Sequence, residues 1–169
     1  VGEVVFNTSM TGYQEILSDP SYRGQIVVMT STQIGNVGTN AADDESGVPQ
    51  VEGFVVRELS AAPSNWRSTQ ALHEYLSQHD IPGIAEVDTR AITRHLRSLG
   101  VLNGVIASGT TDVEALVRVA REAPGLESFD LVRQVTCPAA YDWTEPRDPH
   151  WAEPFDAPPA PSRVRCVAY

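Results

Sequence analysis

The sequence has no lysine, only two cysteines and no apolar run approaching twenty residues. A helix that crosses a membrane needs about 20 consecutive apolar residues, so no membrane association is predicted. The cysteines, Cys137 and Cys166, lie far apart without the close spacing of metal ligands, which argues against a disulfide framework and a zinc site. A globular protein without a bound metal, in a reducing, cytoplasmic compartment, is therefore expected.

Positive charge is scarce as well. The formal net charge is −10 at pH 7, and all 12 cations are arginines scattered along the chain. Binding to nucleic acid or to an anionic membrane needs clustered cations that neutralise phosphate, so neither is expected as the main partner. A basic protein partner or a neutral small molecule is a better match to this charge.

Apolar runs and turn signals alternate along the chain and predict an α/β fold with helices laid on a sheet. The crowded early strands indicate a second sheet layer. Strands are expected over residues 3–9, 25–31, 51–59, 84–87 and 104–108. A short helix is expected over 12–18, and longer helices are expected after the cap residues Ser68 and Asp88 and after the capping-box sequence TDVE at 111–114.

Each longer helix has an apolar face that should be buried on the sheet. The residues expected on these faces are Leu72, Tyr75 and Leu76 in the first helix, Ile92, Leu96 and Leu99 in the second, and Val113, Leu116, Val117 and Ala120 in the third.

The end of the sequence has a different composition. Residues 145–162, EPRDPHWAEPFDAPPAPS, contain six prolines and no periodicity, which is typical of an extended linker. RVRCVAY, residues 163–169, then resumes as an apolar strand. The pattern predicts one domain over 1–144, a linker over 145–162 and the first strand of a following domain over 163–169.

The stretch DPSY, residues 19–22, predicts a tight turn. Asp19 is a favoured first residue of such a turn, and Pro20 presets the backbone at the second position. Ser21 should then stand at an exposed corner and offer its hydroxyl, together with its backbone N–H, to a small polar ligand such as a free amino acid. The alternative is a serine that only caps local backbone, and the residues alone favour that alternative.

The sequence DTRAITRHLR places Arg90, Arg94 and Arg97 on one face of the helix that follows Asp88. Such a stripe is usually a solvated face. On so acidic a chain, however, it is also a candidate surface for docking a partner.

Longer ordered motifs resemble a known family. NTSMTGYQEILSDPSY (7–22), followed by QIV and IGNVGTN (34–40), and later AEVDTRAITRHLR (85–97), are similar to the N-terminal domain of the small subunit of glutamine-hydrolysing carbamoyl-phosphate synthetase. The similarity extends in order over residues 1–144. The linker and RVRCVAY resemble the lead into that family's glutaminase domain.

This resemblance implies a swivelling three-layer β/β/α domain beside a class I glutamine amidotransferase domain. In the family, the small subunit hydrolyses L-glutamine, and ammonia passes to a large subunit that uses ATP and Mg to make carbamoyl phosphate for arginine and pyrimidine biosynthesis. The resemblance assigns to Ser21 a contact with glutamine. It implies that the large subunit is the partner, that this domain holds no cofactor of its own, and that it is non-catalytic.

Several features depart from the family pattern. The Gly-x-Cys-x-Gly turn that carries the family's nucleophile is absent, as are the strands that precede VGEVVF in the family, whose loss is expected to leave an apolar face uncovered. The fragment alone is therefore expected to be inactive.

Two other functions are left open by the residues. One is a free-standing interaction module that kept the fold without the enzyme, which a stop soon after Tyr169 in the gene would favour. The other is an independent hydrolase that uses Asp88 and His95, although both residues have simple structural roles as a helix cap and an exposed helix residue.

Overall fold

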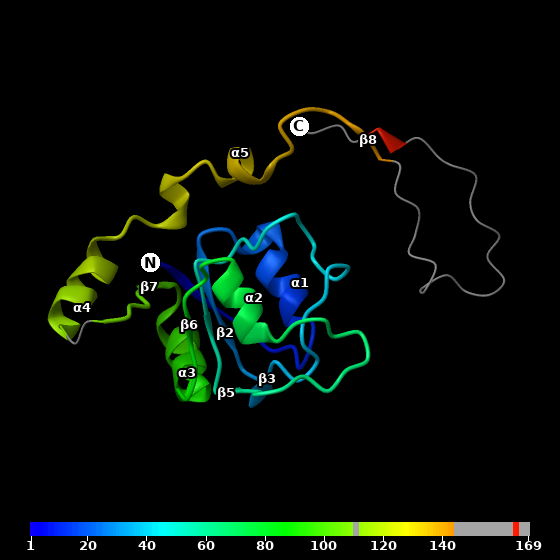
Figure 1. Ribbon diagram of the computed structural model, residues 1–169. Helices are drawn as coiled ribbons and strands as arrows, with labels where there is room; N and C mark the ends of the chain where they lie inside the picture. The colour runs from blue at the N-terminus through cyan, green and yellow to red at the C-terminus, as the bar shows by residue number, and fades with distance from the viewer. Residues whose placement is uncertain (110–111, 144–163, 166–169) are drawn as a thin grey trace. The chain divides into compact units, whose positions relative to one another are not determined.

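The computed structural model describes residues 1–109, 112–143 and 164–165. These residues divide into two compact units, Val1–Leu131 and Val132–Tyr169. The first unit is built on a five-stranded sheet with the strand order β6-β4-β2-β1-β7 (Figure 1). Its strands are β1 (Gly2–Asn7), β2 (Gln25–Met29), β4 (Gly53–Val55), β6 (Gly83–Ile84) and β7 (Leu102–Gly104).

Four of these strands are parallel, and β7 runs antiparallel to β1. Successive residues of β2 point to opposite faces of the sheet, so Val27 and Met29 belong to one apolar cluster and Ile26 and Val28 to another. All four side chains are at most 2% exposed. The sheet is therefore packed on both faces, as expected for a mostly parallel sheet.

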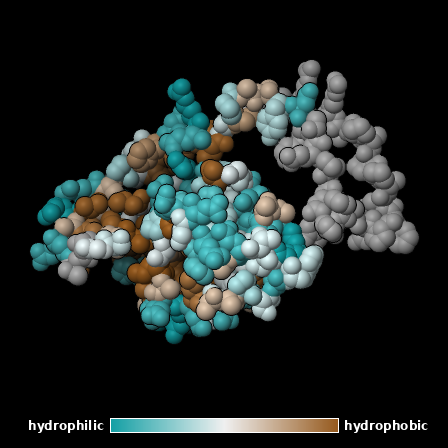
Figure 2. All heavy atoms as spheres, in the orientation of Figure 1, coloured by the Kyte–Doolittle hydropathy of each residue, from teal (hydrophilic) through white to brown (hydrophobic). Residues whose placement is uncertain are grey.

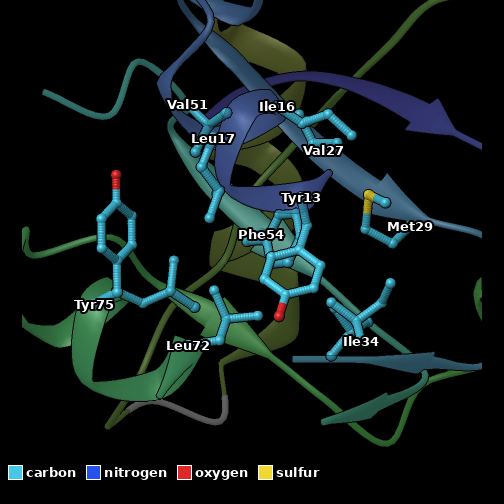
Figure 3. Close-up of a cluster of buried hydrophobic side chains, with 12 residues drawn as sticks. Tyr13, Ile16, Leu17, Val27, Met29, Ile34, Val51, Phe54, Leu72 and Tyr75 are labelled. Atoms are coloured by element: carbon cyan, nitrogen blue, oxygen red, sulfur yellow. The ribbon is translucent and has the colours of Figure 1, made fainter. Parts of the chain in front are cut away.

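Two short helices, α1 (Tyr13–Ser18) and α2 (Leu72–Gln78), cover the face that carries Val27 and Met29 (Figure 1). Figure 3 shows the side chains of this cluster between the helices and the sheet, with the ring of Tyr13 at its centre beside Phe54. On the other face, Ile92 of α3 (Thr89–Leu99) packs against the cluster formed by Ile26, Val28 and Val55.

The apolar segment over 51–59 differs from the single strand that was expected. It divides into β4 and a separate strand, β5 (Glu58–Leu59), which pairs in parallel with β3 (Gln33–Ile34) to form a small second sheet. The run VEGFVVREL contains no turn residue between the two parts, and composition does not reveal the change of partner. The mixed α/β class and the presence of a second sheet are confirmed.

The remaining strands are shorter than expected or displaced. β6 ends at Ile84, where 84–87 was expected, and β7 lies at 102–104, where 104–108 was expected. Gly104, the last residue of β7, pairs with Gly2, and a Cβ at Gly104 would collide with the Val4 side chain.

One expected helix start is wrong, and one expected cap is shifted by one residue. The helix expected after Ser68 begins at Leu72, and Glu74 accepts a hydrogen bond from the N–H of Ala71, while the Ser68 hydroxyl donates to the Gln70 carbonyl. The helix expected after TDVE is α4 (Val113–Glu122), and its cap is Asp112. By contrast, Asp88 caps α3 as predicted, through a 3.0 Å bond from the Ala91 N–H.

The burial expected for the later helices is only partly found. Leu96 is 7% exposed, but Leu99 is 62% exposed. In α4, all of whose residues are described, no side chain is buried, and Val113 and Val117 are 66% and 41% exposed. Figure 2 shows apolar surface in the region of α4.

The chain continues from α4 through a short 3-10 turn, Leu126–Ser128, to α5 (Leu131–Val135), which spans the division between the units. In the second unit, β8 (Asp142–Trp143) pairs antiparallel with β9 (Val164–Arg165). The expected linker over 145–162 lies outside the described residues, as does most of the strand expected over 163–169. Among the residues described, every helix is too short or too polar to cross a bilayer.

Candidate functional site

The turn at residues 19–22, called here the Ser21 corner, is a 3-10 turn over Pro20–Tyr22 that follows α1 directly. The N–H of Tyr22 donates to the Asp19 carbonyl at 3.0 Å, which closes the turn. The N–H of Ser21 donates to the Asp19 carboxylate at 2.8 Å. Asp19 and Pro20 therefore act as the sequence predicts for the first two positions of a tight turn.

Ser21 is exposed, as expected, but only part of it is available to a ligand. Its backbone N–H already donates to Asp19, so the expectation that both groups are offered is corrected. Its hydroxyl makes no hydrogen bond to any residue in the described part of the chain. The corner thus presents one unpaired hydroxyl on a turn whose backbone is fixed.

The Ser21 corner is also fastened to the sheet. The Tyr22 hydroxyl accepts a 2.9 Å hydrogen bond from the Asn7 side chain at the end of β1. The N–H of Arg23 donates to the Pro20 carbonyl, and Gly24 follows with a φ of 80°, which favours glycine. These contacts hold the corner from the side of β1 and β2.

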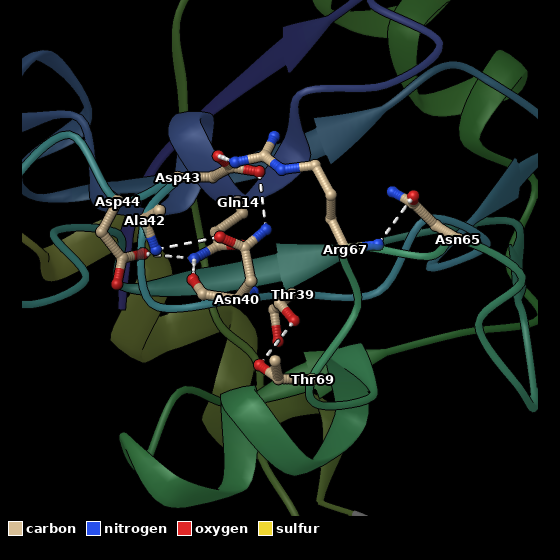
Figure 4. Close-up of polar contacts among 9 residues, drawn as sticks. All are labelled: Gln14, Thr39, Asn40, Ala42, Asp43, Asp44, Asn65, Arg67 and Thr69. Carbon is tan, nitrogen blue, oxygen red and sulfur yellow. Dashed lines mark hydrogen bonds and ion pairs between the residues drawn. The ribbon is translucent and has the colours of Figure 1, made fainter. Parts of the chain in front are cut away.

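The helix that leads into the Ser21 corner, α1, takes part in a polar network with the segment 40–50, called here the acidic loop (Figure 4). The Gln14 side chain accepts from the Asn40 N–H at 2.9 Å and donates to the Asp44 carboxylate at 2.9 Å. The Tyr75 hydroxyl of α2 donates to the same Asp44 oxygen at 2.7 Å. Burial raises the pKa of Tyr75, and the hydrogen bond to the Asp44 carboxylate raises it further.

A second contact fixes the start of the acidic loop. Arg67 and Asp43 form an ion pair at 2.6 Å, and Asp43 also accepts from the Asn40 side chain at 2.7 Å. Their side chains are 21% and 25% exposed, so this pair is better protected from solvent than the Arg57–Asp88 pair at 3.9 Å.

The predicted docking stripe lies on the exposed side of α3. Arg90, Arg94 and Arg97 are all exposed, and none of them forms an ion pair with another described residue. Three cations are thus presented without local compensation, which is the arrangement that the docking hypothesis requires.

Asp88 and His95 both belong to α3, Asp88 as its cap and His95 within the helix. The Asp88 carboxylate accepts from the Ala91 N–H as the cap of α3, and His95 is exposed farther along the helix. The described residues also contain no group of three or more His, Cys, Asp or Glu side chains placed to hold a metal ion.

Comparison with known proteins identifies the family of the chain. Residues 1–106 match the family described as the carbamoyl-phosphate synthase small chain, CPSase domain. The chain belongs to this family. The resemblance of the DPSY and DTRAITRHLR motifs to carbamoyl-phosphate synthase is thereby confirmed, and both the Ser21 corner and α3 fall within the matched residues.

Curated relatives agree with this assignment. The carbamoyl phosphate synthase small chain of Syntrophotalea carbinolica is 53% identical over 169 residues, which are 99% of this chain and 44% of the relative. Those of Nostoc sp. and Escherichia coli strain K12 are 52% and 53% identical over 151 and 146 residues, covering 89% and 86% of this chain. The matches cover only 39% and 38% of those two relatives, so the chain spans about two fifths of their length.

The acidic-loop network was not predicted from the sequence. A signal was present, because Gln14 and Ser18 are polar residues four positions apart in α1 and therefore share one face of the helix. Both are buried, at 3% and 0% exposure. Their partners lie more than 20 residues away in a loop without periodicity, and sequence patterns carry no information on such pairs.

Proposed function

We propose that this chain functions as a non-catalytic domain within the small chain of a glutamine-hydrolysing carbamoyl-phosphate synthase. In this role the Ser21 corner contributes to the glutamine pocket of an amidotransferase domain, and the surface of α3 contributes to docking on the large subunit. ATP and Mg serve the large subunit, the product enters arginine and pyrimidine biosynthesis, and the complex works in the cytoplasm. The observation that carries the proposal is the unpaired hydroxyl of Ser21 on a rigid, exposed turn within the family-matched region.

A hydroxyl is well suited to this task. It can donate to the carboxylate of glutamine or accept from its ammonium group, because a serine hydroxyl has one donor and two acceptor positions. The fixed backbone of the corner means that little conformational freedom is lost when the ligand binds.

The test is the Ser21→Ala substitution in the full-length small chain, assembled with its large subunit. Loss of one hydrogen bond to a polar ligand costs about 0.5–1.5 kcal/mol, so the glutamine KM should rise roughly threefold to tenfold. Synthesis from ammonia should be nearly unchanged, because ammonia bypasses the pocket. Ser77→Ala, at an exposed serine of α2, is the matched control and should change neither reaction.

The opposite pattern would contradict the assignment. An unchanged glutamine KM together with a collapse of ammonia-dependent synthesis would show that Ser21 holds the fold together and does not hold glutamine.

The docking role of α3 has its own test. Reversing charge at Arg94 and Arg97 should weaken co-purification of the large subunit and make its remaining loss with salt shallower, because the attraction that salt screens is gone, and adding Arg90→Glu should weaken binding further. Arg118 and Arg121 of α4 have the same spacing and are also exposed, so their reversal is a matched control. Equal binding by both pairs of variants across a salt series would remove α3 from the interface.

The chain by itself is proposed to be inactive toward glutamine. A nucleophile needs an adjacent base and donors for the oxyanion. Cys137, the one cysteine in the described part of the chain, lies on neither the Ser21 corner nor the acidic loop. Glutamine turnover by the purified chain that is abolished by Cys137→Ala or Cys166→Ala would refute this.

A further inference from the structure

Ser18, the last residue of α1, is fully buried, and both its hydroxyl and its carbonyl are hydrogen-bonded. Its hydroxyl donates to the Gln14 carbonyl at 2.8 Å and accepts from the N–H of Glu45 at 2.9 Å. Its own carbonyl accepts from the Ser46 hydroxyl at 2.6 Å. One small side chain therefore joins the end of α1 to the middle of the acidic loop.

The acidic loop is held to α1 on both sides of this contact. Before it, Gln14 binds both backbone polar groups of Asn40. After it, the Gln50 N–H donates to the Leu17 carbonyl at 2.8 Å. The carbonyl groups of Leu17 and Ser18 lie at the C-terminal end of α1, where helix carbonyls have no partner within the helix, so the loop supplies the missing donors.

Only Asp19 and Pro20 separate Ser18 from Ser21, and neither allows much movement. Pro20 fixes its own φ, and the Asp19 carboxylate is occupied by the Ser21 N–H. The position of the Ser21 backbone is therefore tied to the last residue of α1, in addition to its tie to β1 through Tyr22.

We propose that Ser18 is a positioning residue for Ser21: by clamping the acidic loop onto the end of α1, it fixes the corner from which the Ser21 hydroxyl reaches glutamine. This inference rests on the proposed role of Ser21 in the glutamine pocket. The substrate is the amino acid itself, and the acidic loop acts on it only through the corner.

The first experiment is Ser18→Ala in the full-length small chain assembled with its large subunit. The substitution removes the acceptor of the Glu45 N–H and loosens the loop, so the glutamine KM should rise about threefold to tenfold, with a smaller fall in kcat. Ammonia-dependent synthesis should be unchanged. Ser77→Ala is the matched control, because its hydroxyl also donates to the carbonyl four residues earlier at 2.8 Å but lies exposed on α2.

The second experiment separates positioning from general weakening of the fold. If Ser18 acts through Ser21, Ser18→Ala should cause little further rise in the glutamine KM when Ser21 is already alanine. The same fold-increase in both backgrounds would overturn the inference.

Failure of this inference can be told apart from failure of the proposed function. If Ser21→Ala leaves the glutamine KM unchanged, the role of Ser21 itself is lost, and the inference is overturned with it. If Ser21→Ala raises the KM and Ser18→Ala does not, only the inference is overturned. If the Ser18→Ala small chain does not assemble, Ser46→Ala is used in its place. Ser46 is half-buried, and its substitution removes the hydroxyl that donates to the Ser18 carbonyl. A rise in the glutamine KM of this variant supports the inference, and an unchanged KM overturns it.

Discussion

Helices α3 and α4 begin in the same way and lie in different surroundings. Each is capped by an aspartate, Asp88 with φ −77° and ψ 82° and Asp112 with φ −76° and ψ 82°. Each carboxylate accepts from the N–H three residues later, at 3.0 Å and 2.9 Å. Yet α3 buries Thr89 and Leu96, whereas α4 has no buried side chain.

The difference shows that the local signals which form a helix do not determine what it packs against. Caps and apolar periodicity are properties of a dozen neighbouring residues. Burial depends on whether a sheet face lies beside the helix, and α3 has the cluster around Ile26 and Val28 beside it. The family match follows the same division, since it includes α3 and ends at residue 106, before α4.

The largest effect expected from this contrast concerns the buried leucine of α3. Leu96→Ala should lower the free energy of unfolding by about 2–4 kcal/mol, because a large side chain is removed from a packed site. Leu99→Ala on the same helix and Val117→Ala on α4 should change it by less than about 0.5 kcal/mol, because both residues are exposed. Urea denaturation of the three variants is the measurement, and equal losses would erase the contrast.

Alkaline pH should destabilise the packed sheet, to which α3 belongs. Burial raises the pKa of Tyr13 to about 12, and Tyr13 belongs to the core cluster on the sheet. The pKa of Tyr13 in the folded state therefore lies above the unfolded value of about 10. The contribution of the neutral Tyr13 side chain to the free energy of unfolding is fully present below pH 10. It is lost as pH rises from 10 toward 12, at up to about 1.4 kcal/mol per pH unit.

Tyr13→Phe should remove the share of Tyr13 from that loss and leave the share of Tyr75, whose pKa is also raised, at the cost of the 2.9 Å bond that the Tyr13 hydroxyl donates to the Gly38 carbonyl. Urea midpoints measured at pH 8, 10 and 11 for the chain and for the variant would test this. A variant whose stability falls as steeply as that of the unchanged chain would contradict the assignment to Tyr13.

The smallest effect should come from the caps themselves. Asp88→Ala should lower the free energy of unfolding by about 1 kcal/mol, since α3 is part of the packed domain. Asp112→Ala should change global unfolding by much less and instead speed amide hydrogen exchange in the first turn of α4. Exchange rates read residue by residue, together with denaturation, distinguish the two cases. A global loss of equal size would show that α4 is coupled to the sheet.

The sequence predicted the elements whose signals are local. The cap of α3 by Asp88 and the turn at Asp19-Pro20 are both confirmed, because each depends on residues within three or four positions. The division of 51–59 between two sheets and the exposure of Val113 were missed, because strand partners and burial depend on distant residues. Ser18 was missed for the same reason, since its partner Glu45 lies 27 residues away.

The strand order has a consequence for folding during synthesis. Strands β1, β2, β4 and β6 leave the ribosome in the order in which they lie side by side, so each newly made strand meets a neighbour that is already in place. β7 alone returns to the start of the sheet and pairs Asn103 with Glu3, roughly a hundred residues earlier. Among the described strands, only β7 pairs with the side of β1 that faces away from β2, and unpaired backbone groups on an edge of this kind are a template for pairing with other chains. Once β7 has left the ribosome and paired, the backbone groups of β1 are covered, and the short strand β7 becomes the edge of the sheet in place of the longer β1.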